Sequence, residues 1–338
     1  MNTEMELDRA NGRTAVATAI VPVFALAIFT SAVLLFWVQP LIAKMLLPLL
    51  GGAPSVWNTC MLFFQALLLA GYAYALLLSQ RLSLRNQAIV HAVLLLVAAL
   101  VLPFAISNRL LSWLPAQSTP IFWLLATLFV TVGPPFLLIS ATAPLLQRWF
   151  SHTNHKSARD PYFLYAISNA GSMLALLAFP FVFEPAFAVR TQSMIWAVSY
   201  AALVVFIVAC GIVLNRTSAA PDVNLVVSDD AVEPVATATR VQWALLAFVP
   251  SSLMLGVTTY IATDVASVPL IWIVPLALYL ATFIIAFGRT QIVKPLIVSL
   301  SLPFLVVGLG AVKIINPPIS VWLTILLHLL LFFIAALV

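Results

Sequence analysis

The chain contains about ten apolar stretches of about 20 residues each. This length is enough for a helix to cross the hydrocarbon core of a bilayer. A segment inside that core must be helical, because no water is present to satisfy its backbone. Hydrophobic residues make up 64% of the sequence and charged residues only 7%, so a soluble domain could not hide this apolar surface. We therefore expect an all-α fold, a polytopic transmembrane helical bundle in a lipid bilayer.

The expected spans are separated mostly by short polar loops. They are residues 15–38, 57–79, 88–106, 120–145, 161–183, 191–213, 241–262, 267–287, 295–312 and 319–338. Pro134, Pro135 and Pro180 fall inside spans, which is tolerated when neighbouring groups satisfy the freed backbone. Cys60 and Cys210 both lie in apolar stretches, so we expect neither a disulfide nor a metal site.

One long polar segment, from Asn215 to Arg240, separates six spans from the remaining four. Its acids, small residues and prolines are typical of a flexible cytoplasmic linker. The predicted organisation is a cytoplasmic N-terminus (1–14), a first six-span bundle (15–213), a linker (214–240) and a second bundle (241–338). Six spans, a linker and at least four further spans favour a major-facilitator-like architecture. The last residues are apolar without a polar flank, so we expect the chain to be a fragment of a longer protein.

Basic residues predict the orientation of the chain. With the N-terminus in the cytoplasm, the inside receives Arg9, Arg13, Arg81, Arg85, Arg148, Lys156, Arg159, Arg216, Arg240, Arg289 and Lys294. The outside then receives only Lys44, Arg109, Arg190 and Lys313. Cytoplasmic loops carry an excess of Lys and Arg, so this orientation is favoured. The net charge of +5 is explained by topology, and we expect no binding of nucleic acid.

Polar side chains in or beside spans are the natural functional candidates, because burying them in a membrane is costly. In the first cluster, Gln39 and Pro40 are expected to break the helix, and Lys44 follows in an apolar run. Asn58 and Gln65, on the second span, are spaced to share one helix face. Two interpretations stay open: a snorkelling lysine with amides bonded to neighbouring helices, or the wall of a polar pathway.

A second cluster lies between the seventh and eighth spans, where Thr259 and Asp264 are the main candidates. Asp264 falls at the same place in the second half as Lys44 does in the first. One interpretation is an ion pair between the halves that gates the outer side. The other is an exposed loop acid.

The fifth span carries Asn169 among small residues at three- and four-residue spacing, namely Ser168, Gly171, Ser172 and Ala175. Such a stripe permits close helix contact. Asn169 is expected to bond to another helix, with a solute ligand as the alternative. His91 and His328, each in an apolar run, are expected to be hydrogen-bonded packing residues.

Catalytic motifs are missing from the sequence. It has no Gly-rich phosphate or dinucleotide loop, no paired carboxylates on one helix and no grouping of nucleophile, histidine and acid. We therefore assign no catalytic residue, no cofactor and no metal site.

Three long stretches resemble a known family: VQPLIAKMLLPLLGGAPSVWNTCMLFFQALLLAGYAYA (38–75), DPYFLYAISNAGSMLALLAFPFVFEP (160–185) and PSSLMLGVTTYIATDVASVPLIWIVPLALYLATFIIAF (250–287). They resemble the membrane part of the bacterial fused MFS/spermidine synthase family, also called spermidine synthase-like membrane proteins. The resemblance implies a facilitator-like region in the inner membrane, often followed by a Rossmann-like aminopropyltransferase domain. The chain lacks the Gly-rich loop and acids of that domain, so no catalytic residue carries over.

Two hypotheses follow for function. The first is a transporter-like domain that moves a small cationic solute such as a polyamine by rocking its two halves. The second is a membrane anchor for a fused or separate aminopropyltransferase-like domain. An intact Gly-rich loop with its acids downstream of Val338 favours the second.

Overall fold

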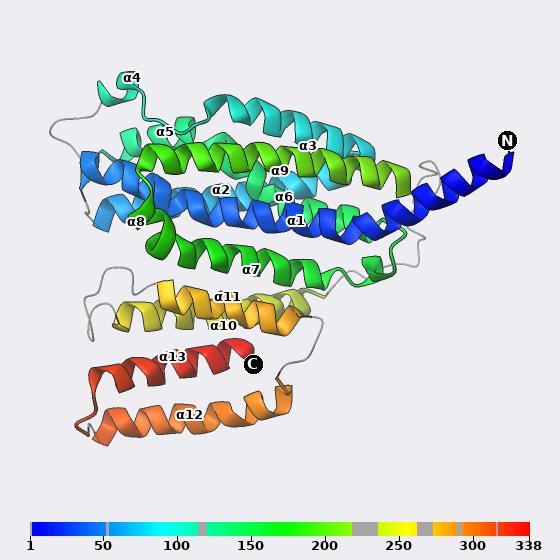
Figure 1. Ribbon diagram of the computed structural model, residues 1–338. Helices are drawn as coiled ribbons and strands as arrows, with labels where there is room; N and C mark the ends of the chain where they lie inside the picture. Colours follow the sequence, from blue (N-terminus) through cyan, green and yellow to red (C-terminus); the bar gives the residue numbers. More distant parts are fainter. Residues whose placement is uncertain are drawn as a thin grey trace. The chain divides into compact units, whose positions relative to one another are not determined.

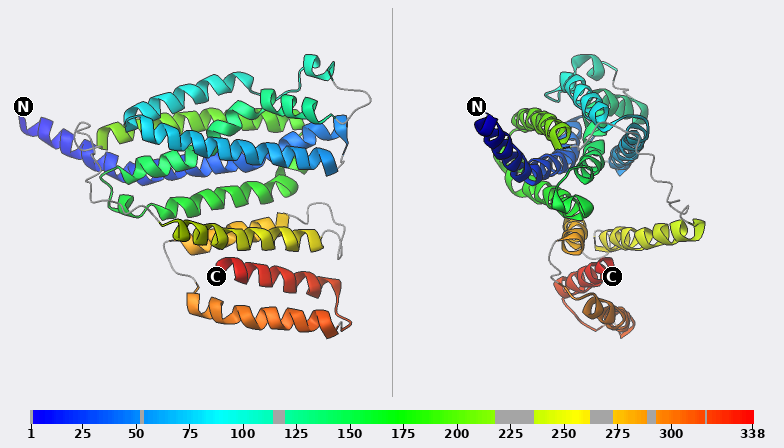
Figure 2. Two further views of the ribbon diagram at one scale, coloured as in Figure 1. Left: turned by 180° about the vertical axis from the view of Figure 1, so that it is seen from behind. Right: turned by 90° about the vertical axis from the view of Figure 1, so that its right-hand side faces the viewer.

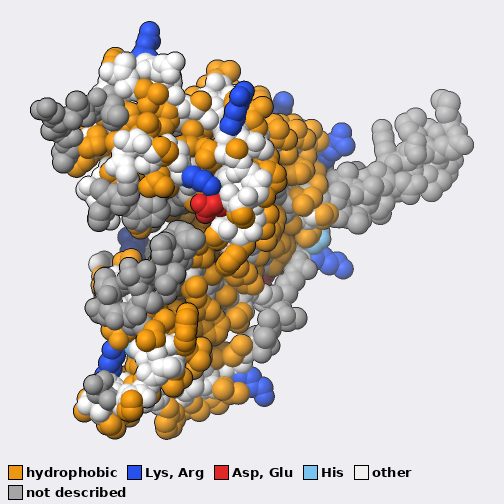
Figure 3. Space-filling model, turned by 60° about the vertical axis from the view of Figure 1, so that its left-hand side comes forward, with side chains coloured by type: hydrophobic (Ala, Val, Ile, Leu, Met, Phe, Trp, Pro, Cys, Tyr) orange, Lys and Arg blue, Asp and Glu red, His pale blue; other side chains and the backbone are white. Residues whose placement is uncertain are grey.

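The structure, a computed structural model, describes residues 2–51, 54–113, 120–217, 236–261, 273–288, 293–315 and 317–338. Every regular element in these ranges is a helix, as the hydropathy predicts. The chain divides into two compact units, Met1–Pro221 and Asp222–Val338, and the division falls in the segment predicted as the linker. On the face in Figure 3, hydrophobic side chains predominate and charged ones are few.

Unit 1 is built from long helices that run side by side (Figures 1 and 2). Its elements are α1 (Asn2–Leu50), α2 (Pro54–Arg81), α3 (Leu84–Ala98), η1 (Ala99–Val101), α4 (Asn108–Leu111), α5 (Ile121–Thr131), α6 (Gly133–Ser151), η2 (Lys156–Arg159), α7 (Tyr162–Ala178), η3 (Phe179–Phe183), α8 (Glu184–Ala186) and α9 (Val189–Thr217). Unit 2 contains α10 (Thr237–Tyr260), α11 (Ile273–Phe287), α12 (Pro295–Ile315) and α13 (Val321–Leu337).

The number of membrane-length helices is lower than predicted. Among the described residues, 7 helices are long and apolar enough to cross a membrane, or 8 if α5 and α6 form one bent span. Helices α11 and α13 are apolar but have only 15 and 17 described residues. The expectation of a helical membrane bundle is confirmed, whereas ten full-length spans are not observed.

The predicted break at Gln39 and Pro40 is wrong. Helix α1 is continuous from Asn2 to Leu50 and contains Pro22, Pro40 and Pro48, so Lys44 lies on α1 and not in a connection. The side chain of Gln39 folds back and donates to the Leu35 carbonyl (3.4 Å). A proline removes only one backbone donor, and the packing of α1 against its neighbours supports the helix through this gap.

Helix α1 lies at the centre of unit 1, where it packs on α7, α9 and α6, while α2 packs on α6 and α3 on α9. The small-residue stripe on α7 makes the close contact that was expected. A Cβ added at Gly171 would lie 2.7 Å from the Phe29 carbonyl oxygen of α1. Gly71 plays the same part on α2, since an added Cβ would lie 2.7 Å from the Leu137 carbonyl oxygen of α6.

Buried aromatic side chains tie the helices of unit 1 together through hydrogen bonds to backbone carbonyls. The indole of Trp196 on α9 donates to Leu34 of α1 (3.1 Å), and the hydroxyl of Tyr200 donates to Leu95 of α3 (2.9 Å). Such bonds between helices add to the packing that holds membrane helices together.

Unit 2 is thinner. Helix α13 packs on α10, α11 and α12, around a small core of Val257, Ile261, Ile325 and Phe332. Most side chains of α10 and α12 are exposed. Exposed apolar surface of this kind suits lipid and not water.

Candidate functional site

The first candidate residue, Lys44, forms an ion pair within unit 1. Its Nζ lies 3.4 Å from Oε1 of Glu184, and it also donates to the backbone carbonyl of Glu184 (3.4 Å). The side chains are 29% and 41% exposed, so solvent or headgroups reach the pair. The snorkelling interpretation gave Lys44 no partner. The gate interpretation paired it with Asp264, which lies outside the described residues.

The chain holds Glu184 in place through an irregular turn. Helix α7 widens at Pro180 into the π-helical turn η3, where the Glu184 N–H bonds to the carbonyl of Phe179. Phe183 stacks on Trp37 of α1 with ring centroids 3.9 Å apart. The amide of Gln192 donates to the carbonyls of Phe183 (3.0 Å) and Phe187 (2.9 Å). Single π-helical turns inside α-helices are frequently found at functional sites.

Two polar atoms of this region are buried without a hydrogen-bond partner: Trp37 Nε1 and Gln192 Oε1. One is a donor and the other an acceptor. An unpartnered buried polar atom lowers the free energy of unfolding by about 1–3 kcal/mol, so the presence of two such atoms here needs an explanation.

A second irregularity lies between α5 and α6. The two helices bend by 63° at Val132, where Gly133, Pro134 and Pro135 follow. The predicted single span 120–145 is therefore broken, because two consecutive prolines remove two backbone donors. The hydroxyls of Thr127 and Thr131, just before the bend, are buried without a hydrogen-bond partner. Both residues border a cavity of about 10 Å³, which is the size of one water molecule.

A polar cluster lies in the core between α2, α3 and α6. His91 is fully buried, with Nε2 3.1 Å from Thr142 Oγ1 and Nδ1 3.4 Å from the Tyr74 hydroxyl. Thr142 donates its own proton to Leu138 (3.0 Å), so it accepts from His91, and Nδ1 is left to accept from Tyr74. This set agrees with the expectation of a hydrogen-bonded packing histidine.

Gln87 extends the same core cluster. Its Oε1 accepts from the Trp149 indole (3.0 Å), and its Nε2 donates to the Leu82 carbonyl (2.8 Å). The cluster thus links α2, α3 and α6 through buried polar side chains whose hydrogen bonds are made with described residues.

The other predicted residues are dispersed. Asn58 and Gln65 lie on α2 with exposed side chains, and neither forms a hydrogen bond with a described residue. The amide of Asn169 donates to the Tyr165 carbonyl (2.8 Å) of its own helix, and among the described residues the expected bond to another helix is not observed. Thr259 lies exposed on α10.

Unit 2 has a cluster that sequence reasoning missed. The ammonium of Lys313 lies 4.0 Å from the ring centroid of Tyr260 and also bonds to its hydroxyl. The ring of His328 stacks on that of Tyr260, with the two ring centroids 4.5 Å apart. The three residues lie on different helices, and no local pattern links them. Glu184 was also missed, although it is the sole acid of the sequence between Asp160 and Asp222.

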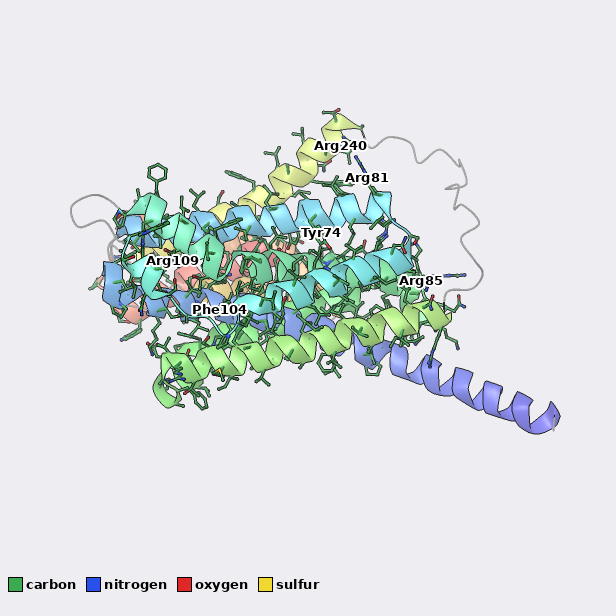
Figure 4. All side chains as sticks on the ribbon, turned by 90° about the horizontal axis from the view of Figure 1, so that it is seen from above. Tyr74, Arg81, Arg85, Phe104, Arg109 and Arg240 are labelled. Atoms are coloured by element: carbon green, nitrogen blue, oxygen red, sulfur yellow. The ribbon has the colours of Figure 1, made fainter. Side chains whose placement is uncertain are left out.

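The charged residues of unit 1 gather at its two ends. Figure 4 shows Arg81 and Arg85 at one end and Arg109 at the other, with Tyr74 between them. Because successive helices run in opposite directions, Arg148, Lys156 and Arg159 belong to the Arg81 end, and Lys44 belongs to the Arg109 end. The middle of the bundle carries no charged side chain among the described residues.

Within the described part of the chain, no three His, Cys, Asp or Glu side chains come together as a metal site would require. Cys60 and Cys210 are free and buried. No protein-family model matches the chain, and no curated protein matches it at a significant level. Fold and surface together define a helical, multi-pass membrane protein.

Proposed function

We propose that the chain is a transporter-like membrane domain that moves a small cationic solute such as a polyamine. The observation that carries this proposal is the pair of irregular helices in unit 1, the 63° break before α6 and the π-turn before Glu184. Both accompany buried polar atoms without partners. A broken helix at membrane depth, as at the α5–α6 bend, is typical of solute sites in transporters, where such helices coordinate the cargo. The π-turn lies nearer the end of unit 1, beside the exposed Lys44–Glu184 pair.

An anchor for a soluble domain needs none of these features. Straight apolar helices with small residues at their contacts are sufficient to hold a protein in a bilayer. Broken helices and unpartnered polar atoms cost stability, so their presence favours a role that uses them. No observation on the described residues favours the anchoring alternative, which rests on the family resemblance.

A reciprocal pattern of helix contacts supports the facilitator-like architecture. Helix α1 packs on α7 at Gly171, and α6 packs on α2 at Gly71. The spans of unit 1 are α1, α2, α3, the bent pair α5 and α6, α7 and α9. If the first three are exchanged in order with the last three, α1 takes the place of the α5–α6 pair and α7 takes the place of α2. The contact of α1 with α7 then becomes the contact of α6 with α2. Each six-helix half of a facilitator is built from three-helix repeats related in this way.

The charge of the solute is proposed from Glu184. It is a partly exposed carboxylate at the π-turn, and its partner Lys44 is itself a cation on a flexible side chain. A cationic solute can compete with Lys44 for this carboxylate, which would open the contact between α1 and the π-turn. The proposal includes an inner-membrane location with the N-terminus in the cytoplasm.

Uptake by reconstituted protein tests the proposal. Proteoliposomes containing the chain should accumulate radiolabelled putrescine or spermidine above protein-free vesicles, and Glu184→Gln should reduce the uptake at least about fivefold, as loss of a charge-assisted contact implies. Asp160→Asn, at an exposed acid near the other end of unit 1, is the matched control and should leave uptake unchanged. Absence of uptake of any polyamine, or equal effects of both substitutions, would contradict it.

A further inference from the structure

A groove of about 530 Å³ opens on the surface of unit 1 between α2 and α6. Its α2 wall contains Tyr72, Leu76 and Ser79, and its α6 wall contains Arg148, Ser151 and His152 at the helix end. Neither the proposed solute pathway nor the core polar cluster uses these side chains. The groove therefore calls for a separate explanation.

The lining of the groove is graded along the helix axes. Ser79, Ser151, His152 and Arg148 lie within a turn or two of the ends of α2 and α6. Deeper in the bundle the walls become apolar, with Leu76 and Tyr72 on α2 and Pro144 and Leu145 on α6. Tyr72 and Leu76 are 50% and 57% exposed, so an apolar ligand can contact them. A groove with a polar mouth at the helix ends and apolar walls further in fits an amphiphilic ligand that lies parallel to the helices.

The polar mouth is positively charged. Arg148 is exposed, and its guanidinium forms no ion pair with a carboxylate of the described residues. Lys156 and Arg159 follow on η2 at the same end of unit 1. The nearby acid, Asp160, accepts the backbone N–H of Tyr162 and does not line the groove.

The carbonyls at the end of α6 do not repel an anion strongly. The carbonyl of Arg148 accepts from the Ser151 hydroxyl (2.7 Å) and from His152 Nδ1 (2.8 Å). Those of Trp149 and Phe150 accept the backbone N–H groups of His152 and Thr153. The negative end of the helix dipole is thus largely compensated inside the protein.

We propose that this groove binds an anionic phospholipid, with the phosphate against Arg148 and an acyl chain along Leu76 and Tyr72. Basic pockets between membrane helices recognise anionic lipid headgroups, and the expected cytoplasmic side of unit 1 faces the leaflet surface that carries them. The inference depends on the membrane class of the protein and on the proposed orientation of unit 1, and it is independent of the proposed transport.

Native mass spectrometry of the purified chain in detergent, titrated with phosphatidylglycerol or phosphatidylcholine, tests the headgroup contact. We expect one saturable phosphatidylglycerol site and no comparable site for phosphatidylcholine. Arg148→Gln should weaken phosphatidylglycerol binding about fivefold, as expected for one basic residue near a membrane surface. Arg85→Gln, at an exposed arginine of the same end that does not line the groove, should have no such effect.

A second pair of variants tests the acyl contact and does not depend on Arg148. Leu76→Gln should weaken binding, whereas Leu77→Gln should not, because Leu77 is 54% exposed on the same helix but lies outside the groove. Equal effects within either pair overturn the proposal. Equal binding of the two lipids also overturns it, and so does full displacement of the lipid by inorganic phosphate, which would indicate a site for free anions.

Discussion

The ammonium of Lys44 lies 3.4 Å from a carboxylate oxygen of Glu184, a residue 140 positions further along the chain. The contact joins the last turns of α1 to the π-turn that ends α7, and it pairs Lys44 with the acid of this end of unit 1. It also gives Lys44 a partner in its own unit.

The first prediction concerns this ion pair. Because both side chains are partly exposed, a double-mutant cycle of Lys44→Gln and Glu184→Gln should give a coupling of about 0.2–1 kcal/mol in the free energy of unfolding. The charge-swapped double variant should recover part of the loss caused by either single reversal. Unfolding in mild detergent, followed by circular dichroism, measures each variant.

The alternative partner of Lys44 is tested in the same way. A cycle of Lys44→Gln with Asp264→Asn should be additive if Glu184 is the sole partner. Coupling with Asp264 together with additivity for Glu184 would restore the predicted gate between the two halves of the chain.

The second prediction concerns the close contact of α1 and α7. Gly171→Ala should lower the free energy of unfolding by about 1–3 kcal/mol, because the added Cβ would lie 2.7 Å from the Phe29 carbonyl oxygen and must push the helices apart. Gly308→Ala is the control, since nothing lies within 4 Å of its added Cβ and alanine favours the helix. Similar stability of the two variants would refute the close packing.

The third prediction concerns the buried cluster around Gln87. Gln87→Leu should cost about 1–3 kcal/mol in the free energy of unfolding, because the Trp149 indole N–H would remain buried without an acceptor. Gln65→Leu makes the same chemical change at an exposed position on α2 and should leave stability unchanged or higher. Trp149 fluorescence should shift in the first variant only.

The fourth prediction concerns topology. Reporter fusions should place residues 82–86, 150–158 and 218–238 in the cytoplasm, and residues 108–118 and 314–318 outside. The reason is the excess of Lys and Arg assigned to the inner loops. An outside signal from the 218–238 fusion would reverse the orientation.

Several features of the fold were predictable because they depend on local sequence. Apolar runs of membrane length must be helices, and the small-residue stripe around Gly171 favoured a close helix contact. The continuity of α1 through Pro40 was not predictable in this way, because a proline either breaks a helix or is absorbed by it according to what packs around it. The break at Val132 also depends on what packs around the prolines that follow it, but there the helix is broken and not continued.

The site residues depend still more on packing. Lys44 was recognisable as a costly charge in an apolar run, yet its contact with Glu184 could not be derived, since their distance depends on how α1 and α7 pack. Tyr260, Lys313 and His328 come together for the same reason, although the first two are 53 positions apart in the sequence.

The sequence by itself determined that this is a helical protein of the membrane, because the absence of water in a bilayer allows long apolar segments no other regular structure. Only the tertiary structure decided which polar groups meet, which remain unpartnered and where the helices bend. Those outcomes depend on side-chain contacts between distant segments, and hydrophobicity, which is nearly uniform along these spans, carries no information about them.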